Sequence, residues 1–107
     1  MYTVINHIRV VPEHREAFEE RFRQNLVHME GVEGFLKVQV WRPSASANPD
    51  GDYPHDAYMI QTTWRDEQAF RGWIRSPSFR ASHAQPMPEQ WRAGSAMMSQ
   101  HILAFDM

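Results

Sequence analysis

Three side chains in this sequence could carry chemistry: the amide of Asn6, the indole of Trp73 and the imidazole of His83. A neutral imidazole can bind a metal or move a proton. An indole offers a flat apolar surface, and an amide can donate a hydrogen bond to a ligand. Trp73 and His83 both fall in the stretch 66–85, so we expect the rest of the chain to build a walled pocket around them.

The stretch 66–85 has the pattern of two short helices broken at a Ser-Pro pair. Asp66 can cap the first helix, and Ser76 can cap the second, which has proline at its first position. Phe70, Trp73 and Ile74 have the spacing of one apolar stripe on the first helix. The sequence therefore predicts that Trp73 faces the interior.

His83 and Asn6 each allow a structural and a functional interpretation. Phe79 and His83 are four residues apart, so they share one side of the second helix. A structural histidine at the edge of an aromatic stripe is the more common case, and a ligand is the alternative. Asn6 interrupts an apolar row in the first strand, where an unpaired buried amide costs about 1–3 kcal/mol. It either bonds nearby backbone or points into a cavity.

Composition limits the classes of protein. The chain has 107 residues, which suits a single domain over 1–107. A net charge of −2 without a basic stripe argues against nucleic-acid binding. No cysteine is present, which excludes disulfides and thiolate chemistry. No stretch is apolar enough to span a membrane, so we expect a cytoplasmic protein without a membrane partner.

Hydrophobic periodicity predicts the order β-α-β-β-α-β, which is the ferredoxin-like pattern of an antiparallel sheet with helices on one face. The first helix carries an inward stripe of Phe18, Phe22, Leu26 and Met29. A turn-rich loop covers 44–56, and a proline-containing connection at 86–94 is expected to pass over a pocket mouth. We expect strands at 2–11, 35–42, 57–64 and 98–105, a first helix at 12–29 and the split helix at 66–85.

The outward face of the predicted sheet is not cleanly polar. The alternation places on it Ile5, Phe35, Trp41, Met59, Ile102 and Ala104. An apolar outer face of this size needs a cover. We therefore predict a homodimer joined sheet against sheet.

Three segments carry a family resemblance: INHIRV at 5–10, EGF at 33–35, and the W-x4-AF-x2-W-x2-S-x2-F-x3-H spacing over 64–83. Together they resemble the antibiotic biosynthesis monooxygenase (ABM) superfamily. Within it they are similar to the haem-degrading branch of the IsdG/MhuD type. The resemblance extends over 2–105 and implies a dimeric α+β barrel made of two ferredoxin-like subunits.

The resemblance implies a role for each of the three side chains. His83 would be the proximal ligand of the iron of haem b. Trp73 would press on the porphyrin and buckle it, and Asn6 would donate a hydrogen bond to the distal ligand. Haem would be cofactor and substrate, opened with O2 and an external electron donor, with release of iron. Phe22, Leu26, Phe70 and Phe79 would be pocket walls, although ordinary core positions are the stronger explanation for them.

Other functions stay open at this point. Relatives of the same superfamily oxidise quinols or polyaromatic compounds without a cofactor. A non-enzymatic haem-binding or sensor protein is a second alternative. A non-haem iron site is a third, with His7, His28, His55 and His101 as its candidates, but they fall on different elements without metal-ligand spacing.

Overall fold

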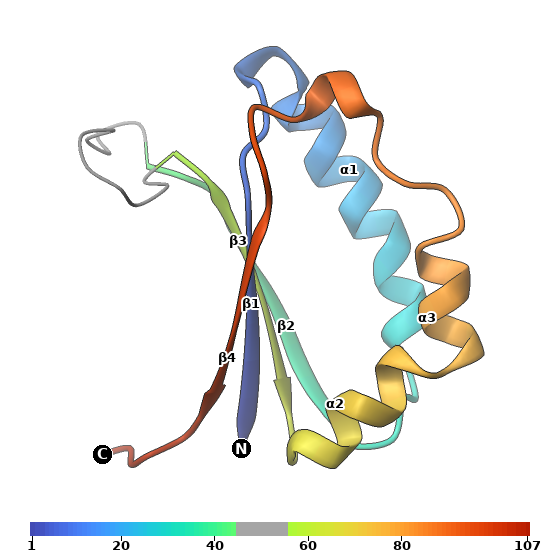
Figure 1. Ribbon diagram of the computed structural model, residues 1–107, viewed down its shortest axis with the longest axis vertical. Helices are drawn as coiled ribbons and strands as arrows, with labels where there is room; N and C mark the ends of the chain where they lie inside the picture. The colour runs from blue at the N-terminus through green and yellow to red at the C-terminus, as the bar shows by residue number, and fades with distance from the viewer. Residues whose placement is uncertain (45–55) are drawn as a thin grey trace.

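The computed structural model describes residues 1–44 and 56–107 (Figure 1). Most of the loop predicted at 44–56, with His55, lies outside the described residues. The strands are β1 (Tyr2–Ile8), β2 (Phe35–Trp41), β3 (Tyr58–Trp64) and β4 (Met97–Ile102). The helices are α1 (Arg15–Asn25), α2 (Glu67–Ile74) and α3 (Pro77–Ser82), with 3-10 turns η1 (Pro12–His14), η2 (Leu26–Met29) and η3 (Glu89–Trp91).

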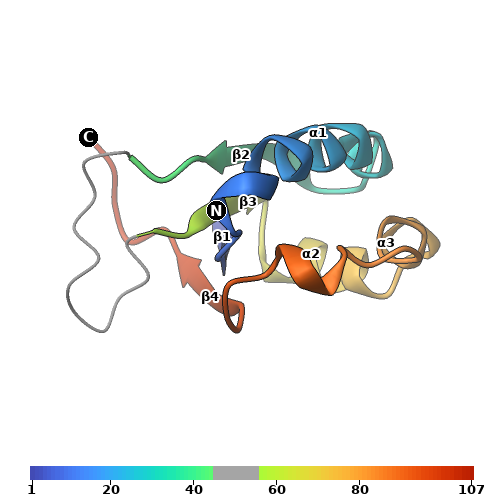
Figure 2. The same cartoon turned by 90° about the horizontal axis from the view of Figure 1, so that it is seen from above.

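The four strands form one antiparallel sheet in the order β2-β3-β1-β4. All three α-helices lie on the same side of it (Figure 1). Seen from above, α1 lies towards β2, and α2 and α3 lie towards β4 (Figure 2). This is the ferredoxin-like arrangement that the order of elements predicted. Among the described helices, none has the length and apolarity needed to cross a membrane.

Side-chain caps fix the two short helices where the sequence predicted them. The carboxylate of Asp66 accepts a hydrogen bond from the backbone N–H of Ala69 at 2.8 Å. The hydroxyl of Ser76 accepts one from the backbone N–H of Phe79 at 3.1 Å and donates to the carbonyl oxygen of Trp73 at 2.7 Å. Each cap satisfies a helix N–H that would otherwise lack a partner. The Ser76 bonds also link the end of α2 to the start of α3.

The core on the helix side of the sheet consists of two clusters. The first lies under α2 and contains Tyr2, Val4, Met29, Trp64, Ala69, Phe70 and Trp73. The second lies under α1 and contains Val10, Phe18, Tyr58 and Ile60. Asn6 lies on β1 between Val4 of the first cluster and Ile8, which packs against the second. Along β1, the side chain of Asn6 therefore lies between the two clusters.

A β-bulge changes the face predicted for Phe35. The register shifts between Phe35 and Lys37, and Phe35 pairs with Trp64. A bulge inserts one extra residue and so reverses the alternation beyond it. Phe35 consequently packs edge-on against Trp64 at 5.4 Å on the helix side, and Leu36, predicted to face inwards, is 51% exposed. The prediction that Phe35 lies on the outer face was wrong.

Two further positions differ from the periodic pattern. Ile102 was predicted on the outer face, but it pairs with Tyr2, and directly paired residues share a face. β4 ends at Ile102, whose side chain is 75% exposed, so the strand does not continue to 105. Ile74 was expected in the inward stripe of α2 but is 40% exposed, because it is the last helical residue.

Candidate functional site

His83 directly follows α3, and its imidazole is exposed. The ring lies against Phe79 with centroids 4.0 Å apart. Nδ1 is 2.9 Å from the carbonyl oxygen of Phe79 and 2.8 Å from the hydroxyl of Ser82. A carbonyl can only accept, so the neutral imidazole carries its proton on Nδ1. Nε2 is left with its lone pair, which is the form that binds a metal.

Trp73 links this histidine to the core. Its indole meets Phe79 edge to face at 5.5 Å and 88°. On its other side it stacks with Trp64 at 6.1 Å and 30°. The rings of Trp64, Trp73, Phe79 and His83 thus form a continuous row from the buried core to the exposed imidazole. Trp73 is 7% exposed and cannot turn away without disturbing two neighbours.

Asn6 occupies the centre of the sheet. It pairs with Ile60 of β3 and with Met98 of β4, and it shares the helix-facing side with Tyr2 and Val4. Its side-chain amide makes no hydrogen bond to any residue within the described ranges 1–44 and 56–107. Because no fully buried side-chain N or O atom in those ranges lacks a partner, the unpaired amide of Asn6 reaches solvent and is available to a ligand.

The predicted wall residues divide into two groups. Phe22, Leu26 and Phe79 are half-buried. Phe22 packs against the second cluster and Phe79 against the first. The two rings therefore belong to the clusters on either side of Asn6. Phe70 is buried against the rings of Tyr2 and Trp64, at 6.0 and 5.8 Å, and it mainly serves the core.

The proline-containing connection after α3 covers the second cluster. Met87 and Trp91 pack against that cluster, and Trp91 stacks on His14 at 5.7 Å. The carbonyl oxygen of Trp91 accepts a hydrogen bond from the N–H of Val11 at 2.8 Å. The connection therefore closes the end of the core near the start of α1.

An open depression of about 400 Å³ lies between the turn 30–33 and α2. Trp73 contributes to its lining, whereas His83 and Asn6 do not. It therefore borders the row of rings without containing the other two candidate residues.

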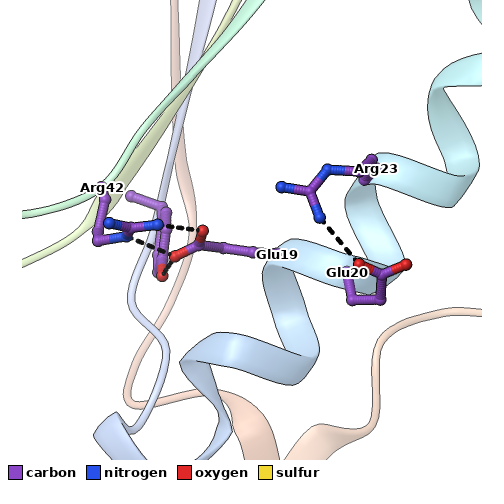
Figure 3. A network of polar contacts seen from close by, with 5 residues as sticks. Glu19, Glu20, Arg23 and Arg42 are labelled. Carbon is purple, nitrogen blue, oxygen red and sulfur yellow. Dashed lines mark hydrogen bonds and ion pairs between the residues drawn. The ribbon is translucent and has the colours of Figure 1, made fainter.

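A polar cluster fastens α1 to the sheet (Figure 3). Arg42 donates two hydrogen bonds of 2.7 Å to the carboxylate of Glu19, and the hydroxyl of Tyr58 donates a third. These bonds lower the pKa of Glu19 to about 2. Burial and the adjacent carboxylate raise the pKa of Tyr58 to about 12. The cluster thus carries a fixed ion pair, which is suited to holding structure rather than to moving protons.

The sequence reasoning missed Arg21. It lies on α1, and its guanidinium donates to the backbone carbonyl of Gln85. Gln85 is two residues beyond His83. The arginines in this helix were the only signal in the sequence. They do not identify the partner, because the sequence does not show which element α1 faces.

The side chains present fit a haem group. Haem needs one axial ligand, a flat apolar surface and polar control on the other side. His83 offers a free Nε2, Phe79 offers a half-buried ring that is backed by the buried Trp73, and Asn6 offers an unpaired amide. In the described part of the chain, no three His, Asp or Glu residues are grouped so as to hold a metal ion directly. His55, one of the candidates for a non-haem iron site, lies outside that part.

Residues 1–85 match the family model for antibiotic biosynthesis monooxygenases, and the chain belongs to this family. Within it the chain falls in the haem-degrading branch. A haem oxygenase (staphylobilin-producing) from Staphylococcus saprophyticus is 35% identical over 83 residues, covering 78% of this chain and 73% of that protein. The ferredoxin-like fold of the subunit and the family resemblance are therefore confirmed, whereas the dimeric barrel stays a prediction.

Two solved structures share the fold, and the first of them is similar enough in sequence to support the same branch. MhuD from Mycobacterium tuberculosis, a haem degrader with two haems bound in its active site, has a TM-score of 0.75 and 26% identity. That match covers 100% of this chain and 99% of that chain. A MhuD point mutant with two manganese protoporphyrins bound per active site has a TM-score of 0.79 and 24% identity, covering 100% and 98%.

Proposed function

We propose that this protein is a haem-degrading monooxygenase. The observation that carries the proposal is the orientation of His83, whose Nδ1 is 2.9 Å from the Phe79 carbonyl oxygen, so that Nε2 is free for iron. Trp73 lies one ring further along the same row. The kinship with a haem oxygenase and with MhuD supports this interpretation.

When bound, haem would supply an iron centre for O2 chemistry driven by an external electron donor, and its own ring would be the substrate. His83 would hold the iron through Nε2, with the Phe79 carbonyl fixing the tautomer and the ring plane. Trp73 is held between Trp64 and Phe79, so a flat macrocycle pressed against it would have to bend. Asn6 would donate a hydrogen bond from the sheet side. Phe22, Leu26 and Phe79 would exclude water.

We also propose that the protein works as a homodimer joined through the outer face of the sheet. Trp41 is 50% exposed there beside Met59, and Ile5 and Met97 lie on the same face. Apolar surface of this kind favours a partner. Light scattering after size exclusion should give the mass of a dimer for the wild type and of a monomer for Trp41→Glu. Val27→Glu, an exposed apolar site on the helix side, is the matched control and should stay dimeric.

The function is tested by titrating hemin and following the Soret band. We expect a stoichiometric band for the wild type that decays when ascorbate is added in air. In His83→Ala the band should be weakened or shifted, and decay should stop. His14→Ala is the matched control, because His14 also stacks on an aromatic ring but lies at the start of α1. It should behave as the wild type does.

Two outcomes would contradict the proposal. A Soret band that persists under reductant and oxygen would indicate a haem-binding or sensor protein. Absence of any band, together with oxygen uptake on an electron-rich phenol, would indicate cofactor-free oxidation of an aromatic compound.

A further inference from the structure

Met98 lies beside Asn6 on the helix-facing side of the sheet. The two residues are paired across β1 and β4, and directly paired residues share a face. Their side chains are neighbours, because the Cβ atoms of such a pair are about 4.5–5.5 Å apart. Asn6 is the residue proposed to donate a hydrogen bond on the sheet side of haem. The thioether of Met98 therefore adjoins the place where oxygen chemistry is proposed.

The edge position of β4 leaves this methionine open. β4 is the last strand in the order β2-β3-β1-β4, and Met98 is 55% exposed although it is on the helix-facing side. Val4, on the same face of β1, is buried. Exposure gives oxidants access to a thioether, which they convert to a sulfoxide. Met98 can thus be reached by an oxidant on its own face of the sheet.

Met97 provides an internal reference for Met98. It is the preceding residue of the same strand and is 50% exposed. It pairs with His7, so it lies on the outer face of the sheet. The two methionines match in chain position and exposure and differ in the face that they occupy. A difference in their reactivity therefore reports on the helix-facing side.

We propose that Met98 is an oxidation site of the haem-loaded protein and that its sulfoxide limits turnover. This inference rests on the proposed function. The oxidant is hydrogen peroxide, formed when O2 takes up two electrons from the donor and two protons, and haem iron promotes its reaction. Peroxide transfers one oxygen atom to the sulfur of Met98. An S–O bond forms and the O–O bond breaks, so the thioether is oxidised by two electrons and the peroxide is reduced to water.

The sulfoxide gives the Asn6 amide a new partner. A thioether sulfur is a weak hydrogen-bond acceptor, whereas the oxygen of a sulfoxide is polar and accepts well. The Asn6 amide has no partner within residues 1–44 and 56–107, so the adjacent sulfoxide can accept from it. Asn6 is then no longer free to donate to a haem ligand, and turnover slows as Met98 is oxidised.

The test adds limiting hydrogen peroxide to the wild type without porphyrin, with hemin, or with zinc protoporphyrin, which fills the site without promoting peroxide chemistry. Tandem mass spectrometry gives the ratio of sulfoxide at Met98 to sulfoxide at Met97. We expect hemin to raise this ratio at least about fivefold over the porphyrin-free protein, because a neighbouring reactant acts at high effective concentration. Zinc protoporphyrin should leave the ratio equal or lower. Since the porphyrin-free protein is the reference, burial of Met97 in a dimer does not affect the result.

Met98→Leu tests the effect on turnover, because leucine nearly conserves the side-chain volume. Under ascorbate in air this variant should consume more hemin than the wild type before its activity is lost. Met97→Leu is the matched control and should lose activity as the wild type does. Methionine sulfoxide reductase should restore the turnover of the spent wild type, because it converts the sulfoxide back to the thioether.

Equal ratios with hemin and with zinc protoporphyrin would overturn oxidation at Met98, and this comparison uses only the unmodified protein. Equal loss of activity in Met98→Leu and the wild type would overturn its effect on turnover. In both cases hemin still binds and decays, so the proposed function stands. Absence of a Soret band in the wild type would overturn the inference and the proposed function together.

Discussion

The backbone carbonyl oxygen of Phe79 lies 2.9 Å from Nδ1 of His83, and the two rings stack at 4.0 Å. One residue thus fixes both the tautomer and the plane of the imidazole four positions later. Such an arrangement makes Nε2 a pre-oriented ligand, because little rotational freedom is left to lose on binding.

Phe79→Leu should separate these two contributions. The substitution keeps the carbonyl bond and apolar bulk but removes the ring that supports His83 and Trp73. We expect hemin affinity to fall several-fold with the Soret position unchanged, since the ligand stays the same. A visible titration beside Phe105→Leu, an 80% exposed site, measures the difference. Equal affinities in both variants would show that the stacked ring does not orient the histidine.

Trp73→Phe should separate binding from turnover. The smaller ring fills less of the space between Trp64 and Phe79, so it should bend a bound macrocycle less. We expect near-normal hemin binding and a slower decay of the Soret band under ascorbate. Trp73→Ala should also destabilise the fold by about 3–5 kcal/mol in urea unfolding, as buried aromatics do. Decay at the wild-type rate in Trp73→Phe would remove the role proposed for the indole.

Glu19 should make the stability of the fold depend on acid pH. Its pKa is lowered from 4.5 to about 2, so the ionised form is favoured in the folded state. The stabilisation is complete above pH 4.5, and it is lost as the pH falls through about 2. Because Arg42 is largely exposed, we expect Glu19→Gln to cost only about 1 kcal/mol at neutral pH.

Urea unfolding of the wild type and of Glu19→Gln between pH 2 and pH 7 checks this dependence. The difference in unfolding free energy between them should shrink towards acid pH. Glu20→Gln, whose partner Arg23 is exposed, is the control and should differ little from the wild type. A constant difference across the whole range would contradict the role of the Glu19 carboxylate.

Gly34→Ala should destabilise the contact between β2 and α2. Gly34 has φ +77°, and an added Cβ would lie 2.3 Å from the Cβ of Ala69. The strained backbone and the overlap together should cost about 2–4 kcal/mol. Gly31→Ala shares the positive φ of +73° but meets no atom within 4 Å, so it should cost only the backbone part. Thermal unfolding of both variants isolates the cost of the overlap with Ala69. Equal losses of stability in the two variants would show that the overlap contributes nothing.

The sequence predicted the parts of the fold that follow from local rules. The caps at Asp66 and Ser76, the stripe through Phe18 and Met29, and the position of Trp73 all depend on spacing within one element. Phe35 and Ile102 were misplaced because a bulge and a strand end depend on pairing between strands, which periodicity does not encode. Arg21 was missed for the same reason, since its partner lies on another element.

The site itself was predicted in part. Spacing placed Trp73 on the first short helix and Phe79 with His83 on one side of the second, and the structure joins the three in one row of rings. Asn6 stood out as a polar residue in an apolar row, but only the sheet register shows that it lies between the two core clusters. Their roles towards haem stay predictions.

The product of hemin turnover tests most directly whether this protein degrades haem. Hemin-loaded protein should be reduced in an atmosphere of labelled oxygen, and the pigment analysed by mass spectrometry while a ferrous chelator records released iron. We expect an opened tetrapyrrole containing labelled oxygen and one released iron per haem consumed, in the wild type and in His14→Ala but not in His83→Ala. Recovery of intact hemin, or release of iron without a labelled tetrapyrrole, would contradict haem degradation by this protein.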